Sequence, residues 1–277
     1  MKNNNYILPD GNVQISFSGG RTSAYMLYKI LEANDGLPDR AKVLFANTGR
    51  EMTETLDFVQ ECSDRWNVNI TWLEYDLIDN KPNYREVSHN SASRNGEPFE
   101  KLIKKKRYLP NPTARFCTSE LKINTMRRYL RNPLDLGWNK WTATIGIRAD
   151  ESSRIKDSND KMFDLWYPLN GDKVDKNQIH SFWAKQSFKL NLTIGNKTSP
   201  KGNCDLCFLK SEKILAQMIK EYPEKVTWWQ EMEKEIGLPF VKGRDLTDFQ
   251  KFVEAQHDWV FDQQGYFCQA DGGECTG

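Results

Sequence analysis

The most informative segment of this chain is Ile15-Ser16-Phe17-Ser18-Gly19-Gly20-Arg21-Thr22-Ser23, where two glycines separate two regular elements. Apolar residues at 13–17 predict a short strand, and the apolar spacing at 23–33 predicts an amphipathic helix. Glycines let the backbone approach an anion closely, and the free N–H groups at a helix N-terminus favour phosphate. The segment therefore predicts a phosphate-binding loop made of Ser18, Gly19, Gly20, Arg21, Thr22 and Ser23. An ordinary tight turn capped by serine would have the same pattern.

Strands and helices continue to alternate after this loop. Segments 42–46 and 69–75 predict strands, and the amphipathic segment 53–66 between them predicts a helix with Cys62 on its buried side. A fourth strand is expected at 141–147. The β-α-β-α-β order implies an α/β fold with a Rossmann-like parallel sheet and right-handed crossovers.

The rest of the chain is expected to be irregular or helical. The polar, basic segment 80–115 predicts an irregular insertion with one short helix at 99–106. Further helices are expected at 118–130, from Asp175 with Gln178 completing a capping box, at 211–222 and 224–236, and at 247–256 with a capping box of Thr247 and Gln250. We therefore expect an α/β domain with the phosphate loop over residues 1–169, and a mainly helical, cysteine-bearing C-terminal part over residues 170–277.

The composition argues against several classes of protein. The 277 residues contain 39 Lys and Arg against 38 Asp and Glu, so a net charge of +1 creates no global field that attracts nucleic acid or anionic lipid. No run of 18 apolar residues is present, and the start of the chain lacks the apolar core of a signal peptide. We therefore expect a cytoplasmic protein without a membrane span, whose six cysteines are reduced thiols or ligands.

The Ser-Gly-Gly-x-x-Ser pattern at 18–23 lacks the lysine of a P-loop and the G-x-G-x-x-G of a dinucleotide fold. It resembles instead the PP-loop of ATP pyrophosphatases and of phosphoadenosine phosphosulfate (PAPS) reductases, which belong to the adenine nucleotide alpha-hydrolase superfamily. Four further segments resemble motifs of this superfamily in the same order along the chain, namely 47–55, 116–122, 146–154 and 202–210. Together the five segments make the chain similar to the PAPS reductase-like family.

The resemblance implies that an adenine nucleotide, either ATP or PAPS, is bound. The PP-loop would then hold phosphate, and Asn47, Thr48 and Gly49 would contact adenine. Glu51 would bind the ribose or, alternatively, act as a carboxylate at the start of the following helix.

The resemblance also implies two catalytic arginines, Arg148 and Arg154. Arginine forks match the oxygens of phosphate and sulfate, and the loop follows a strand of an open α/β sheet, where ligands usually bind. A salt-bridged surface loop, with Asp150 and Glu151 as partners, is the alternative interpretation.

The cysteines predict a metal or cluster site. Cys204 and Cys207 have metal-ligand spacing, and Cys117 and Cys268 would complete a set of four thiolates. Such a set suits a [4Fe–4S] cluster or zinc, and the resemblance to cluster-bearing members favours iron–sulfur. Cys275 is then left on a glycine-flanked tail as a candidate nucleophile or persulfide carrier, unless it replaces Cys268 as a ligand or is simply a terminal thiol.

Three functions remain open from the sequence. The first is sulfonucleotide reduction or sulfur transfer, which implies an electron or sulfur donor protein. The second is adenylation by ATP with release of pyrophosphate, with the basic segment 94–115 contacting a nucleic acid acceptor, although a solvated helical face is the more usual role of such a segment. The third is a non-catalytic nucleotide- or metal-binding module. Sulfite-forming PAPS reductases carry a C-terminal Glu-Cys-Gly-Leu-His segment that this chain lacks. Arg115 and Lys122, which flank Cys117, would add positive charge to any of these sites.

Overall fold

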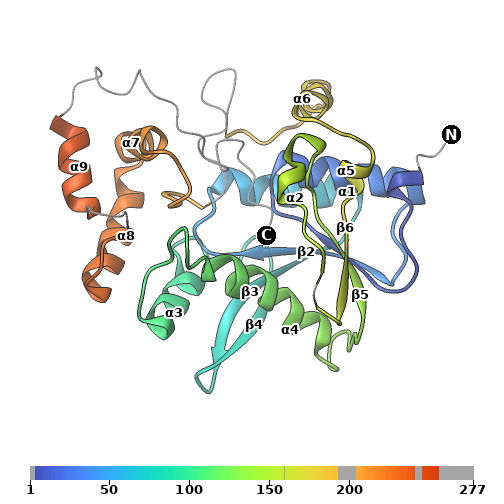
Figure 1. Ribbon diagram of the computed structural model, residues 1–277, viewed down its shortest axis with the longest axis horizontal. Coiled ribbons are helices and arrows are strands. Elements are labelled where there is room, and N and C mark those ends of the chain that lie inside the picture. Colours follow the sequence, from blue (N-terminus) through green and yellow to red (C-terminus); the bar gives the residue numbers. More distant parts are fainter. Residues whose placement is uncertain (1–3, 159, 193–203, 241–244, 256–277) are drawn as a thin grey trace.

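The computed structural model describes residues 4–158, 160–192, 204–240 and 245–255. A six-stranded sheet with the strand order β4-β3-β2-β1-β5-β6 forms the middle layer, and helices lie on both of its faces (Figure 1). All neighbouring strands except β3 and β4 run parallel. The predicted α/β fold with a Rossmann-like sheet is therefore confirmed, with one antiparallel strand added at an edge.

The first half of the sheet follows the predicted alternation closely. Its elements are β1 (Val13–Ser16), α1 (Arg21–Asn34), β2 (Ala41–Asn47), α2 (Thr53–Trp66) and β3 (Ile70–Ile78). β2 is buried along almost its whole length, as expected of a parallel strand covered on both faces. α1 and α2 each end at a residue in the left-handed conformation, Asp35 and Asn67 respectively.

The prediction of an irregular segment after β3 is wrong in part, because the chain turns back at once and adds β4 (Lys81–Val87) to the sheet. Asp79 and Asn80 both have a positive φ (50° and 56°), as in a type I′ hairpin turn. β4 is polar and mostly exposed, so it lacks the apolar alternation by which strands are recognised. The expected short helix is present as α3 (Glu97–Lys106).

The second half of the sheet differs more from the prediction. The helix expected at 118–130 consists of a π-helix at Cys117–Asn124 followed by α4 (Thr125–Arg131). β5 (Trp141–Thr144) is shorter than the expected strand, and β6 (Phe163–Trp166) was not identified in the sequence. β6 has only four residues, too few to show an alternation.

The C-terminal part is mainly helical in the described residues, and α7, α8 and α9 gather at one end of the molecule (Figure 1). The helices are α5 (Pro168–Gly171), α6 (Lys176–Ala184), α7 (Glu212–Glu221), α8 (Pro223–Ile236) and α9 (Leu246–Ala255). The capping box of Asp175 and Gln178 is confirmed. At α9 the cap is instead Asp245, whose carboxylate accepts the Asp248 N–H (2.7 Å), and Thr247 lies inside the helix. No described helix is long and apolar enough to cross a bilayer.

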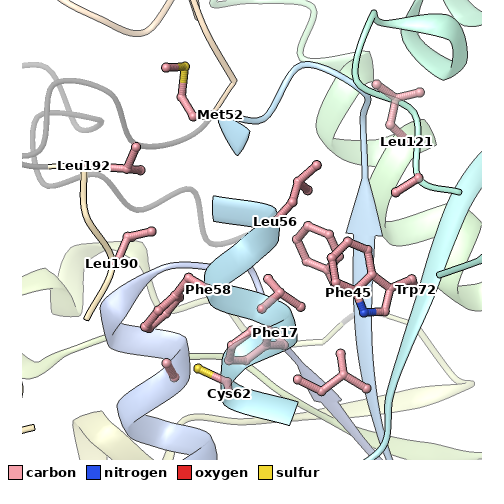
Figure 2. Packing of buried hydrophobic residues seen from close by; sticks show 14 of the residues in the cluster. Phe17, Phe45, Met52, Leu56, Phe58, Cys62, Trp72, Leu121, Leu190 and Leu192 are labelled. Carbon is pink, nitrogen blue, oxygen red and sulfur yellow. The ribbon is translucent and has the colours of Figure 1, made fainter. Parts of the chain in front are cut away.

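The main apolar core lies between the sheet and the helices α1 and α2 (Figure 2). The rings of Phe45 and Trp72 meet edge to face with 4.9 Å between their centroids. Cys62 is fully buried in this core, as predicted, and burial raises the pKa of its thiol, as expected of a structural cysteine. The same core continues into the C-terminal helices, where Phe99 meets Trp229 of α8 at 5.3 Å. A domain boundary near residue 169 stays a prediction.

Candidate active site

The predicted phosphate loop runs from the end of β1 into the first turn of α1. Gly20 precedes the helix in an extended conformation, and the first N–H groups of a helix have no partner within it. The Ser23 hydroxyl donates to the Gly20 carbonyl (3.0 Å), accepts the Ser18 N–H (3.2 Å) and lies 2.9 Å from the Ser18 hydroxyl. These contacts close the loop around its two glycines at the N-terminus of α1, the end of a helix that favours an anion.

Gly19 is fixed as glycine by its conformation and by its neighbours. Its φ is 76°, in the left-handed region that favours glycine. A Cβ atom at this position would lie 2.6 Å from Thr55 Cγ2 and 3.2 Å from Val59 Cγ2, both on α2. The loop therefore packs against α2 so closely that no side chain fits between them.

Gly19→Ala should destabilise the fold more than Gly11→Ala. The two glycines share a similar φ (76° and 79°), but nothing lies within 4 Å of an added Cβ at Gly11. The positive φ costs roughly 1–2 kcal/mol at either position, and the clash with Thr55 is added only at Gly19. Urea unfolding measures the difference. Adding Thr55→Ser removes the clashing methyl group and should recover part of the loss, whereas equal stabilities of the two alanine variants would contradict this explanation.

The loop after β5 packs against the phosphate loop. A Cβ atom at Gly146 would lie 3.5 Å from Ser23 Cα. Arg148 is 6% exposed, donates to Thr22 Oγ1 (3.2 Å) and forms an ion pair with Asp150 (3.0 Å). Arg148 therefore holds the two loops together, with the acidic partner that the alternative interpretation expected.

The other two arginines of the predicted site have separate environments. Arg154 ends a 3-10 helix at Ala149–Arg154 and pairs with Glu151 (2.5 Å), which also lies 3.4 Å from Arg148. Arg21 extends to the Leu190 carbonyl, to which its Nη2 donates (2.9 Å). Of these arginines, Arg154 borders the cavity described next, and Arg148 and Arg21 do not.

A cavity of about 610 Å³ opens between the end of β1, the loop after β5 and the π-helix. Small-molecule sites usually enclose roughly 300–1,000 Å³. Ser18 borders the cavity at the phosphate loop, while Trp141 and Ala143 of β5 and Phe163 and Leu165 of β6 form an apolar floor. An apolar floor beside a phosphate loop suits a nucleotide, because a nucleotide joins a flat base to charged groups.

Lys and Arg supply the charged groups of the described cavity lining, although Arg127 also pairs with Asp160 (2.6 Å) and Arg154 with Glu151 (2.5 Å). The charged residues that border the cavity are Arg115, Lys122, Arg127, Arg154 and Lys156, and no Asp or Glu of the described ranges is among its lining residues. The Nε atoms of Arg115 and Arg127 are buried without a hydrogen-bond partner in the part of the chain that the structure describes. A buried, unpaired N–H is costly, and an anionic ligand in the cavity would give these two atoms an acceptor.

The π-helix and α4 supply much of this lining. The residues on the cavity side are Thr118, Ser119, Lys122, Ile123, Met126 and Arg127. π-Helical turns occur often at functional sites. Arg127 was not predicted from the sequence, although the spacing i, i+3, i+4, i+7 and i+8 from Ser119 would place it on the face of Lys122. Lys156 was not predicted either, because it lies in an irregular segment that no pattern marks.

The segment expected to contact adenine is organised around its own side chains. Glu51 accepts both the N–H (2.9 Å) and the hydroxyl (2.8 Å) of Thr48. Asn47 donates to Glu74 (2.6 Å) and accepts the Gly49 N–H (3.1 Å). Asn47, Thr48, Gly49 and Glu51 are not among the residues that border the 610 Å³ cavity. Their contacts with adenine and ribose therefore stay predictions.

The described part of the chain contains three of the predicted metal ligands, Cys117, Cys204 and Cys207. Cys268 and the predicted nucleophile Cys275 lie outside the described residues. Within the described ranges, no three His, Cys, Asp or Glu side chains gather closely enough to hold a metal ion. The described thiols do not form a metal centre by themselves, and the cluster stays a prediction.

Cys204 lies beside the loop that follows β2. Its Sγ is 3.3 Å from Thr48 Oγ1 and 3.9 Å from Glu51 Oε1. Burial raises the pKa of the Cys204 thiol well above its ordinary value, Glu51 raises this pKa further, and the positive charge of Lys122 lowers it. Cys204 is not among the residues that border the 610 Å³ cavity.

The basic segment 94–115 is engaged in intramolecular pairs along α3. Lys101 pairs with Asp76 (2.5 Å) and Lys104 with Glu100 (2.6 Å). Exposed pairs of this kind contribute little to stability, but they offset charge. The surface of α3 is therefore less positive than its composition indicates.

Two solved structures resemble this chain. One is a PAPS reductase from Candida auris in complex with phosphate (TM-score 0.42, 16% identity, covering 68% of this chain and 82% of that one). The other is the U34-tRNA thiolase NcsA from Methanococcus maripaludis with its [4Fe–4S] cluster (TM-score 0.41, 12% identity, covering 97% of this chain and 80% of that one).

Sequence comparison finds uncharacterized relatives and one family. The nin region protein ORF290 of Escherichia phage lambda is 30% identical over 213 residues, which cover 75% of this chain and 69% of that protein. Protein MJ0973 of Methanocaldococcus jannaschii is 27% identical over 249 residues, which cover 85% of this chain and 50% of that protein. Residues 12–165 match the family model of the phosphoadenosine phosphosulfate reductase domain, and this chain therefore belongs to that family.

Proposed function

We propose that this protein is an enzyme that binds an adenine nucleotide and carries out sulfonucleotide reduction or sulfur transfer. The observation that carries the proposal is the 610 Å³ cavity, which joins Ser18 of the phosphate loop to a group of cationic side chains and an apolar floor. A sulfonucleotide such as PAPS has a flat base and several negative charges, which match these two surfaces.

The charge of the lining favours a sulfonucleotide over ATP. ATP is normally bound with Mg²⁺, which proteins hold through one or two carboxylates together with the phosphates. The described lining of the cavity contains no carboxylate, and its cations would offset the phosphate and sulfate charges directly.

In the proposed reaction, the S–O bond between the sulfonyl group and the nucleotide phosphate breaks. Arg154 and Lys122, which border the cavity together with Ser18, would stabilise the charge that develops on the oxygens. We assign the nucleophile to Cys275, whose sulfur bonds to the sulfonyl sulfur as adenosine 3′,5′-bisphosphate leaves. A dithiol donor protein would then release sulfite and be oxidised to a disulfide, which returns the Cys275 thiol.

A second candidate is adenylation by ATP with release of pyrophosphate, in the service of sulfur transfer to a nucleic acid. Thr276 supports this candidate, because it follows Glu274-Cys275 where the Glu-Cys-Gly-Leu-His segment of sulfite-forming PAPS reductases has glycine. Segment 94–115 would then contact the acceptor. A nucleotide-binding module without turnover is the third alternative.

One product assay separates these candidates. The protein is purified without oxygen and incubated in parallel with PAPS and with ATP, each with a dithiol reductant. We expect adenosine 3′,5′-bisphosphate and sulfite from PAPS. AMP and pyrophosphate from ATP alone would replace the leading proposal by the second, and tight binding without any product would support the third. Ser23→Ala and Arg148→Ala should both reduce turnover, because they open the contacts that close the phosphate loop.

We further propose that Cys117, Cys204, Cys207 and Cys268 hold a [4Fe–4S] cluster, with zinc as the alternative metal. No step of the reaction above passes through it. Quantifying iron, sulfide and zinc in the anaerobic protein tests this proposal directly. We expect close to four irons per chain in the wild-type protein. Cys204→Ser should lose the iron, and Cys62→Ser should keep it. One zinc per chain would favour the alternative, and metal-free protein would contradict both.

A further inference from the structure

The loop that follows β2 and the Cys204–Cys207 loop are joined through their backbones. Glu51 and Cys204 form an antiparallel bridge, and the Asp205 N–H donates to the Arg50 carbonyl (2.8 Å). The bridge sets the Cys204 thiol 3.3 Å from Thr48 Oγ1. Two segments that are about 150 positions apart in the sequence therefore meet at the thiol.

A buried ion pair locks this junction. The side chains of Arg50 and Asp205 are 4% and 0% exposed, and Arg50 Nη2 lies 2.6 Å from Asp205 Oδ2. Arg50 Nε also donates to Asp205 Oδ1 (3.2 Å). Because the guanidinium contacts both carboxylate oxygens, the pair fixes orientation as well as distance.

Helix α8 encloses the same pair. The Trp229 indole N–H donates to Asp205 Oδ1 (2.9 Å), and Arg50 Nη2 donates to the Lys225 carbonyl (3.1 Å). The Arg50 guanidinium also lies over the ring of Trp228, 4.6 Å from its centroid. The Nε and Nη2 groups of Arg50 are thus both directed to the C-terminal part of the chain.

Neither Arg50 nor Asp205 borders the cavity, so neither is placed to touch a ligand there. We propose that Arg50 and Asp205 are positioning residues, which hold the Cys204 thiol in a fixed place beside the loop after β2. Metal ligation or sulfur transfer at Cys204 then depends on Arg50. This residue belongs to the predicted nucleotide-binding domain and takes no part in the chemistry at the thiol. Only the nucleotide-binding readout below rests on the proposed function.

The test uses the full-length protein with Asp205→Asn, which keeps the shape and an acceptor for Trp229 but removes the charge that pairs with Arg50. Hydrogen exchange should become about tenfold faster for the amides of 204–210, since a charge-assisted bond is lost there, and should not change in β1 and β2. The rate at which iodoacetamide alkylates Cys204, with the labelled site identified by mass spectrometry, should also rise about tenfold. Lys140→Met, at an exposed pair with Asp164 (3.1 Å), is the control and should change neither.

Arg50→Met combined with Asp205→Leu provides a second variant, because it removes both charges and leaves neither of them buried alone. If both folded variants exchange and label like wild type in 204–210, the proposal is wrong. Calorimetric binding of adenosine 3′,5′-bisphosphate should stay within about twofold of wild type in both variants, because neither residue borders the cavity, and general destabilisation would not spare it. If wild type does not bind this nucleotide, the proposed function fails, and exchange and labelling still decide this inference.

Discussion

Arg154→Ala should lower turnover of the nucleotide substrate about 100-fold or more, the loss typical of removing one group that stabilises developing charge. Arg154 is the predicted catalytic arginine that borders the cavity. Its partner Glu151 also lies 3.4 Å from Arg148, so the carboxylate keeps a cation beside it when Arg154 is removed. The fold should therefore survive the substitution, and the loss should fall on kcat rather than on stability.

Steady-state kinetics of Arg154→Ala, Arg154→Lys and Arg131→Ala measure this effect. Arg154→Lys keeps the charge but loses the fork, so we expect an intermediate rate. Arg131 is exposed in the last turn of α4 and is not among the residues that border the cavity, so its removal should leave the rate unchanged. A wild-type kcat in Arg154→Ala would remove this residue from the catalytic machinery.

Arg50→Met alone should lower the free energy of unfolding by about 3–5 kcal/mol, because it leaves the Asp205 carboxylate buried without its partner. Replacing both residues, Arg50→Met with Asp205→Leu, should restore most of this stability, since Trp228 and Trp229 offer apolar contacts to the new side chains. Urea unfolding at pH 7 of the single and double variants measures the contrast. Lys140→Met, at an exposed ion pair, should cost less than about 1 kcal/mol.

The loss in Arg50→Met should also depend on pH. Burial raises the pKa of Asp205, and Arg50 beside it acts to lower this pKa, so removing Arg50 raises it further. A carboxyl group with a raised pKa in the folded state binds more protons there than in the unfolded state, so stability falls as the pH rises through this window. The variant should therefore lose less stability at pH 5 than at pH 8. An equal loss of unfolding free energy at pH 5 and pH 8 would mean that the Asp205 carboxylate is not the charge left buried without a partner.

Much of the fold could be predicted because its inner strands are short and apolar. The helices between them are bounded by recognisable turn and loop residues. β1, β2 and β3 have this pattern, and the phosphate loop between β1 and α1 follows from Gly19 and Gly20. β4 could not be predicted in this way, because an exposed edge strand needs no apolar alternation.

The site was less predictable than the sheet. Ser18 and Arg154 belong to short sequence motifs, 18–23 and 146–154, so both could be identified from the sequence. Arg127 could be identified only after the cavity-facing side of the helix, marked by Lys122, was known. Arg50 has no local signal, because its partner Asp205 is 155 positions away. Such long-range contacts depend on how the C-terminal helices pack against the sheet domain. The apolar periodicity of a single segment does not contain this information.

The distance along the chain between Arg50 and Asp205 has a consequence during protein synthesis. Translation at about 5–20 residues per second separates the appearance of two residues 155 positions apart by roughly 8–30 s. Throughout this interval the nascent β2 loop carries an arginine whose counter-ion has not yet been made, while the sheet around it has time to form. The final arrangement around Cys204 must therefore wait for the last third of the chain, and ribosome-bound chains that end before Asp205 should leave this loop accessible to proteases.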